Sequence, residues 1–147
     1  MKFQFKSHLN ISPDLLWAKI NNFEKLNKEL WPVMQMTCPD EYRRKAFHDF
    51  PIGLPVFKSL ILLFGFLPVE RSNVRFLSVT PGGGFSEDSE MILCPSWKHK
   101  RTITPDGDGS IIMDELDITP RSFIFKPVLF LITRLTFFNR HGKLKRL

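Results

Sequence analysis

Cysteine is scarce in this sequence, since Cys38 and Cys94 are the only two among 147 residues. Two cysteines are too few for the disulfide framework of a small secreted domain. Neither lies in a Cys-x-x-Cys pair or at the Cys and His spacing of a zinc site. We therefore expect two reduced, buried thiols, and the sequence predicts neither a bound metal nor a cofactor.

Targeting and membrane-spanning segments are not visible either. The N-terminal residues MKFQFKSHLN contain no apolar run and no small-residue cleavage site, so we expect a cytoplasmic protein. The most apolar segment, FPIGLPVFKSLILLFGFLPV at residues 50–69, is about as long as a bilayer-spanning helix, but prolines and Lys58 interrupt it. We expect instead a helix over residues 54–66 that is buried or lines a pocket.

Motifs of the common enzyme classes are missing as well. The sequence has no nucleophile elbow, no phosphate-binding loop and no metal triad. Gly82, Gly83 and Gly84 follow one predicted strand and lead into another, so they indicate a turn and not a phosphate-binding loop.

Phenylalanine is abundant, with fifteen copies against a single tyrosine. Phenylalanine supplies a large apolar area without a polar group that needs a partner, which suits an apolar interior or an apolar pocket. The hydrophobic fraction of 43% is sufficient for a real core, and the length is that of one domain covering residues 1–147.

Basic residues are concentrated near the C-terminus, although the net charge is only +6. The chain from Arg121 onward contains no acidic residue, and the rest is about neutral. No interleaved basic and aromatic motif indicates nucleic-acid binding. These cations either complement the dipole of a terminal helix or attract an anionic ligand, partner or membrane surface. Weak contact with an anionic membrane would use Arg140, Lys143, Lys145 and Arg146.

Hydrophobic periodicity predicts an α+β domain. Ser12 and Pro13 are typical of a helix start, and Pro120 precedes a long terminal helix that Pro127 and Gly142 interrupt or weaken. Its apolar residues between positions 128 and 138 surround the axis, so we expect most of them to be buried. The other expected elements are a strand at 2–9, a second helix at 23–30, a short strand near 33–38, a loop or irregular helix at 39–51 and hairpin strands at 72–80, 84–93, 97–104 and 109–119.

Alternation along the last three strands places charged residues on the face that is otherwise apolar. The inward set contains Glu87, His99, Arg101 and Asp114 among the apolar residues Phe85, Met91, Trp97, Ile103 and Leu116. Buried charges must be paired, and the Arg101 fork can reach both carboxylates. Three interpretations stay open: a network that fixes strand register, the polar end of a ligand cavity, or acid/base catalysis by His99.

Several segments together resemble a known superfamily. In order and spacing, "LPVE", "PGGGFSEDSEM", "WKHKRTITP", "IIMDELDITPR" and "FFNRHGKLKRL" are similar to bacterial SRPBCC domains of the START-like, polyketide cyclase/dehydrase-like superfamily. The resemblance implies a helix-grip fold, in which a curved antiparallel sheet wraps a long C-terminal helix around a hydrophobic cavity. Relatives bind lipids, sterols, hormones or polyketides, and a minority catalyse cyclisation or dehydration.

The resemblance also assigns the inward cluster to a cavity. The expected function is binding of a small hydrophobic, acid-bearing molecule. We expect Leu131 to line the cavity together with nine site residues: Glu87, Met91, Trp97, His99, Arg101, Asp114, Leu116, Phe130 and Phe138. The alternatives are a cyclase or dehydratase that uses His99 as acid or base with Arg101 at an oxyanion, and a domain that contacts a membrane or partner through its basic helix.

Overall fold

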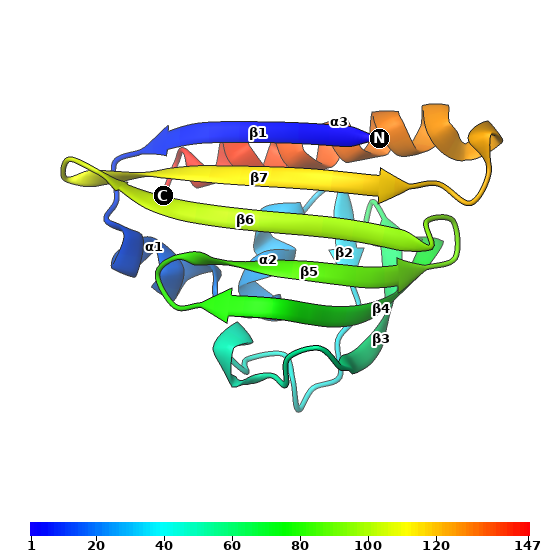
Figure 1. The fold of residues 1–147 in the computed structure, drawn as a ribbon, viewed down its shortest axis with the longest axis horizontal. Helices are drawn as coiled ribbons and strands as arrows, with labels where there is room; N and C mark the ends of the chain where they lie inside the picture. The colour runs from blue at the N-terminus through cyan, green and yellow to red at the C-terminus, as the bar shows by residue number, and fades with distance from the viewer.

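A single antiparallel sheet organises the computed structural model, which describes residues 1–147. Its seven strands follow the order β1-β7-β6-β5-β4-β3-β2, and α3 and α2 lie behind the sheet in Figure 1. The strands are β1 Lys2–Leu9, β2 Met34–Met36, β3 Pro55–Leu63, β4 Leu67–Thr80, β5 Gly84–Met91, β6 Ser96–Asp106 and β7 Gly109–Thr119. The helices are α1 Pro13–Ile20, α2 Phe23–Leu30 and α3 Lys126–Leu144, with 3-10 turns η1 Phe47–Asp49 and η2 Phe123–Phe125.

The long helix α3 packs against β1 and α2, so the sheet curves around it (Figure 1). This confirms the predicted α+β architecture of a curved sheet on a C-terminal helix. The capping prediction also holds in part: Ser12 is the N-cap of α1 and Pro13 follows it, but the Ser12 side chain makes no capping hydrogen bond. Asn22 caps α2, because its side chain accepts a hydrogen bond from the Lys25 amide at 2.9 Å.

Phenylalanine forms much of the core. Phe23, Phe47, Phe76 and Phe85 are all buried in the larger of two core clusters. The rings of Phe23 and Phe47 meet edge-on with centroids 5.1 Å apart, and those of Phe47 and Phe85 at 5.4 Å. Such edge-to-face pairs add stability beyond the area they bury, which explains the use of so many phenylalanines.

The helix predicted over residues 54–66 is wrong, because this segment is strand β3 followed by a turn into β4. Ser59 and Ile61 face inward, whereas Lys58 and Leu60 are exposed. Since the outward face of β3 also carries leucine, the period of two that marks a half-buried strand is hidden in the sequence. Phe64 and Gly65 then adopt positive φ angles in the turn.

The prediction that the middle of α3 is mostly buried is also wrong. Val128, Phe130, Leu131, Leu135 and Phe138 are exposed, because the sheet covers only one side of the helix. No helix of the structure is both long and apolar enough to cross a membrane.

Both cysteines are free thiols. Cys94 is buried, but Cys38 is only half-buried, so the prediction of two buried thiols holds for Cys94 alone. Burial raises the pKa of each thiol to about 11, so both are protonated at neutral pH.

Gly84 is required where β5 meets β6. It has a φ of +114°, and a Cβ atom there would lie 1.9 Å from the Arg101 carbonyl oxygen. We expect Gly84→Ala to lower the free energy of unfolding by at least about 2 kcal/mol in urea titrations, because the added carbon collides with backbone. As a control, Gly142→Ala in α3 meets nothing within 4 Å and should stabilise the protein by about 0.5–1 kcal/mol. Equal effects of the two substitutions would contradict this account.

Candidate ligand cavity and its buried polar cluster

A cavity of about 450 Å³ lies between the concave face of the sheet and α3. Of its 28 lining residues, 21 are hydrophobic, so the space suits a mostly apolar molecule. The aromatic residues Phe23, Phe47, Phe76, Phe85 and Phe137 contribute to this lining.

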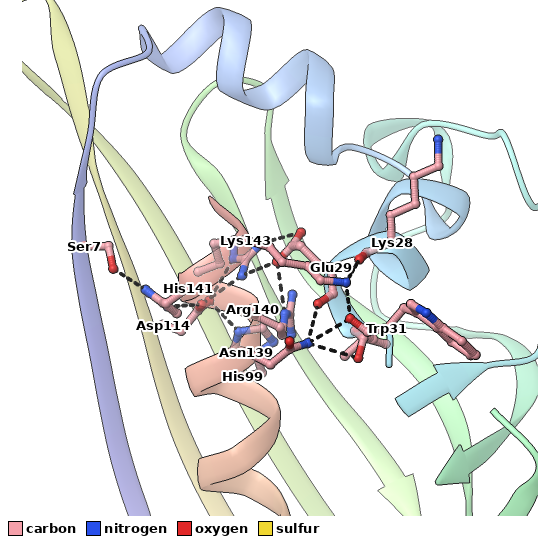
Figure 2. A network of polar contacts seen from close by, with 12 residues as sticks. Ser7, Lys28, Glu29, Trp31, His99, Asp114, Asn139, Arg140, His141 and Lys143 are labelled. Carbon is pink, nitrogen blue, oxygen red and sulfur yellow. Dashed lines mark hydrogen bonds and ion pairs between the residues drawn. The ribbon is translucent and has the colours of Figure 1, made fainter. Parts of the chain in front are cut away.

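A buried polar cluster, partly labelled in Figure 2, contributes Glu87, His99 and Arg140 to the cavity wall. We define this cluster by seven residues that α2, the three strands β5 to β7 and α3 bring together: Glu29, Glu87, His99, Arg101, Asp114, Arg140 and His141. Strand alternation predicts its four sheet residues, and they point inward as expected. Helices α2 and α3 supply the other three.

Asp114 accepts four hydrogen bonds in the middle of the cluster. Its Oδ1 accepts from His99 Nε2 at 2.7 Å and from Arg101 Nε at 2.8 Å. Its Oδ2 accepts from Arg101 Nη2 and from His141 Nε2, both at 2.8 Å. His141 is held from its other side by Ser7, whose Oγ lies 2.7 Å from His141 Nδ1 (Figure 2). Asp114 therefore connects β7 to β6 and to α3.

Glu29 is the second buried carboxylate and connects the sheet to both α2 and α3. It accepts from Arg101 Nη1 and Nη2 at 3.2 and 3.0 Å, and from Arg140 Nε at 3.0 Å. Our sequence reasoning missed Glu29, although a signal exists. Phe23, Leu26, Glu29 and Leu30 recur at helical spacing, and all of them lie on the buried face of α2.

The charges of the two arginines keep both carboxylates ionised. Burial is the largest single influence on the pKa of Asp114 and raises it, but Arg101, His99 and His141 together hold that pKa well below its ordinary value. Burial likewise raises the pKa of Glu29, and the attraction of Arg101 and Arg140 more than offsets this and lowers it. Burial disfavours the charged form of Arg101 and lowers its pKa, but its two carboxylate partners more than offset this and raise that pKa above the usual range.

The contacts of His99 fix where its protons lie. Because ionised Asp114 can only accept, His99 Nε2 must carry a hydrogen. Nδ1 of the same ring lies 3.2 Å from Glu87 Oε1. A hydrogen bond there needs one proton, on either the imidazole or the carboxyl group, so the His99 and Glu87 pair is neutral as a whole.

Two polar atoms at the cavity have no partner. Arg140 Nη2 and Ser72 Oγ are buried without a hydrogen bond, and both residues line the cavity. The Arg140 guanidinium also lies over the Phe137 ring, 4.8 Å from its centroid. No group of three or more His, Cys, Asp or Glu side chains has an arrangement that could hold a metal ion.

Comparison with known protein families identifies one family that matches this chain. A sequence model described as "Domain of unknown function (DUF8410)" matches residues 7–147. The chain belongs to this family. No curated protein sequence matches the DUF8410 chain significantly.

Solved structures similar to this DUF8410 protein share its fold at low identity. Protein CV1439 from Chromobacterium violaceum is 14% identical with a TM-score of 0.70, and the match covers 98% of this chain and 97% of that one. A START superfamily protein from Mycobacterium smegmatis is 10% identical with a TM-score of 0.65 and coverage of 99% and 97%. Ara h 8.0201 is 10% identical with a TM-score of 0.62 and coverage of 98% and 97%. These matches show a START-like helix-grip fold for the DUF8410 chain.

The nine site residues predicted from sequence divide into three groups. Glu87, Met91, Trp97 and His99 line the cavity. Arg101, Asp114 and Leu116 are buried but do not line it.

The expectation for the third group is wrong: Phe130 and Phe138, with Leu131, are exposed and lie outside the cavity. Successive residues of a helix are about 100° apart, so Leu129 and Phe137 occupy the inward positions instead.

The predicted membrane contact also needs a correction. Arg140 is buried and paired with Glu29, so it cannot meet a surface. Lys143 donates to the carbonyl oxygens of Lys28 and Trp31, which leaves Lys145 and Arg146 as the exposed cations of that set (Figure 2).

We expect Asp114→Asn to destabilise the DUF8410 domain by about 3–5 kcal/mol at pH 7, because it leaves Arg101 with too little buried negative charge. Since the pKa of Asp114 is lowered on folding, its stabilising effect is present above pH 4 and is lost as pH falls through the folded-state pKa. The difference between wild type and variant should therefore shrink in acid. Urea unfolding between pH 7 and pH 3 measures both effects.

Asp117→Asn is the matched control, because Asp117 lies on the same strand with its side chain exposed. It should change stability by less than about 0.5 kcal/mol. A comparable loss in both variants would contradict a special role for Asp114.

Proposed function

We propose that this protein binds a small, mostly apolar molecule in the cavity between the sheet and α3. The observation that carries the proposal is the composition of the cavity wall, in which 21 of 28 residues are hydrophobic and the few polar groups include a buried cluster. Ligand sites commonly have volumes of roughly 300–1,000 Å³ and this kind of lining. Similarity to a START superfamily protein supports the same conclusion.

The contacts of the cluster favour binding over acid/base catalysis. His99 uses Nε2 on Asp114 and Nδ1 on Glu87, so neither nitrogen is free to exchange a proton with a bound molecule. Arg101 is committed to Asp114 and Glu29 and does not line the cavity, which argues against an oxyanion role.

A larger side chain that projects into the cavity should weaken ligand binding. We expect Leu129→Trp to weaken binding of N-phenyl-1-naphthylamine, an uncharged apolar fluorophore, at least tenfold, because Leu129 lines the cavity. Leu131→Trp makes the same change on the exposed side of α3, where the leucine is 58% exposed, and should leave the affinity unchanged. Fluorescence titration measures the affinities. Failure of the wild type to bind the fluorophore, together with native mass spectra that show no bound molecule, would disprove the proposal.

A second candidate function, docking on an anionic membrane, is favoured by an exposed apolar stripe. Ile124, Val128, Leu131, Leu135 and Phe138 are exposed and spaced by four and three residues in turn. This spacing places the four that belong to α3 on one side of that helix, and Ile124 lies just before it in η2. Val128 also lines the cavity, so the stripe adjoins the ligand site.

The basic residues around this stripe indicate which kind of surface it contacts. Lys126 and Arg134 lie within the same segment, and no acidic residue occurs from Arg121 onward. A second copy of the chain would bring like charges together, whereas anionic lipid headgroups complement them. We therefore assign the stripe to the surface of an anionic bilayer.

Vesicle flotation tests the stripe. The wild type should float with vesicles that contain phosphatidylglycerol, float less at high salt, and stay unbound to pure phosphatidylcholine. Leu131→Glu should lower the bound fraction at least fivefold, whereas Leu77→Glu, at an exposed leucine of β4, should not. Salt-independent binding, no binding, or a dimer in light scattering that Leu131→Glu dissociates would each overturn the assignment.

A further inference from the structure

Arg140 stands out among the buried charged residues because only part of its guanidinium is used. Nε donates to Glu29 at 3.0 Å, whereas Nη2 is buried and has no partner. The residue is 4% exposed, and it lines the cavity. Nε is the one atom of this guanidinium with a hydrogen bond, so a residue of the cavity wall has donors left for a bound molecule.

An unsatisfied buried donor is destabilising, and more so when it carries charge. Ser72 Oγ, the other unpartnered polar atom of the lining, belongs to a neutral hydroxyl that can rotate. Arg140 cannot adjust in this way, because its guanidinium is held by Glu29 at one edge and lies over the Phe137 ring. The guanidinium is thus a fixed donor group in a mostly apolar cavity wall.

The charge of the cluster determines which acceptor fits this donor. The carboxylates of Glu29 and Asp114 balance the guanidinium groups of Arg101 and Arg140. His141 donates from Nε2 to Asp114, and with the Ser7 hydroxyl donating to its Nδ1 this imidazole is neutral. The His99 and Glu87 pair is neutral, as argued above. An ionised ligand would therefore add one negative charge that nothing neutralises, which is unfavourable in a buried site.

The position of Arg140 on its helix also disfavours an ionised ligand. It lies in the last turns of α3, which ends at Leu144. The C-terminal end of a helix carries partial negative charge, which disfavours an anion. An uncharged oxygen avoids both penalties and still accepts the hydrogen bond.

We propose that Arg140 anchors the ligand by donating from its guanidinium to an uncharged oxygen, a ketone, ester or amide carbonyl, at one end of a mostly apolar molecule. The proposal rests on the cavity-binding function and gives its ligand class. It differs from the acid-bearing ligand expected from the sequence. His99 and Glu87 then serve to keep the cluster neutral rather than to contact the ligand's polar group.

Three naphthalenes of similar shape separate these chemistries: 2-acetylnaphthalene has a carbonyl, 2-ethylnaphthalene has no polar atom, and 2-naphthoate is an anion. Displacement of N-phenyl-1-naphthylamine gives their affinities. We expect the ketone to bind the wild type about tenfold tighter than the hydrocarbon and the carboxylate to bind no tighter than the ketone. Arg140→Lys keeps the charge beside Glu29 and removes the guanidinium donors, so it should abolish the preference for the ketone over the hydrocarbon.

Thr136→Val is the matched control on the same helix. Thr136 lines the cavity, but its hydroxyl already donates to the Ile132 carbonyl at 2.7 Å, so the ketone preference should persist. The wild type offers a second measurement that needs no variant and remains decisive should Arg140→Lys fail to fold. The infrared stretch of ¹³C-carbonyl 2-acetylnaphthalene should move to lower frequency on binding than in hexane.

Each outcome separates the anchor from the cavity function. Equal affinities for ketone and hydrocarbon, or an unshifted carbonyl stretch, would overturn the anchor and leave the cavity function intact. Tightest binding of 2-naphthoate, lost in Arg140→Lys, would overturn the uncharged oxygen and identify an acid as the ligand group. Absence of binding by 2-ethylnaphthalene and by the fluorophore would overturn the cavity function itself.

Discussion

The chain of ion pairs from Asp114 through Arg101 to Glu29 is the interaction on which the rest of the structure depends. These three residues are almost completely inaccessible to solvent, so none of them is stable there without the other two. Because they belong to β7, β6 and α2, the pairing fixes how the helices sit on the sheet. Arg140 and His141 extend the same network to α3 and so set the rotation of that helix about its axis.

That rotation explains why the cavity and the exposed apolar stripe occur together. With Arg140 and His141 turned inward, Phe137 also faces the interior, and Leu131 and Phe138 face away. The same network holds α2 against α3 through Glu29, whose carboxylate both arginines share. The polar cluster thus positions the apolar walls of the cavity, although four of its seven residues do not line it.

The sheet half of the site could be predicted from sequence, whereas in the helical half only Glu29 left a signal, its position on the apolar face of α2. Alternation in "WKHKRTI" and "IIMDELDI" indicates the inner face because one face of each strand carries more apolar residues, although both faces of "WKHKRTI" also carry ionisable ones. Glu29 and Arg140 are single charged residues on helices, where a charge normally marks the solvent side. Only their mutual pairing makes burial possible, and no local pattern records a contact across 111 positions. The helix prediction for the β3 segment was wrong for the opposite reason, because both faces of this strand carry large apolar residues.

The span of the polar cluster along the chain has a consequence for biosynthesis. Ser7 is bonded to His141, and Glu29 to Arg140, so these early residues find their partners only after a further 134 and 111 positions have been synthesised. While α3 is still inside the ribosome, the sheet can form its hairpins, but Glu29 and Asp114 lack part of their partners and the Phe-lined concave face is open. The nascent chain therefore carries an uncovered apolar surface until α3 emerges and packs, and chaperones that recognise such surfaces would engage it throughout that interval.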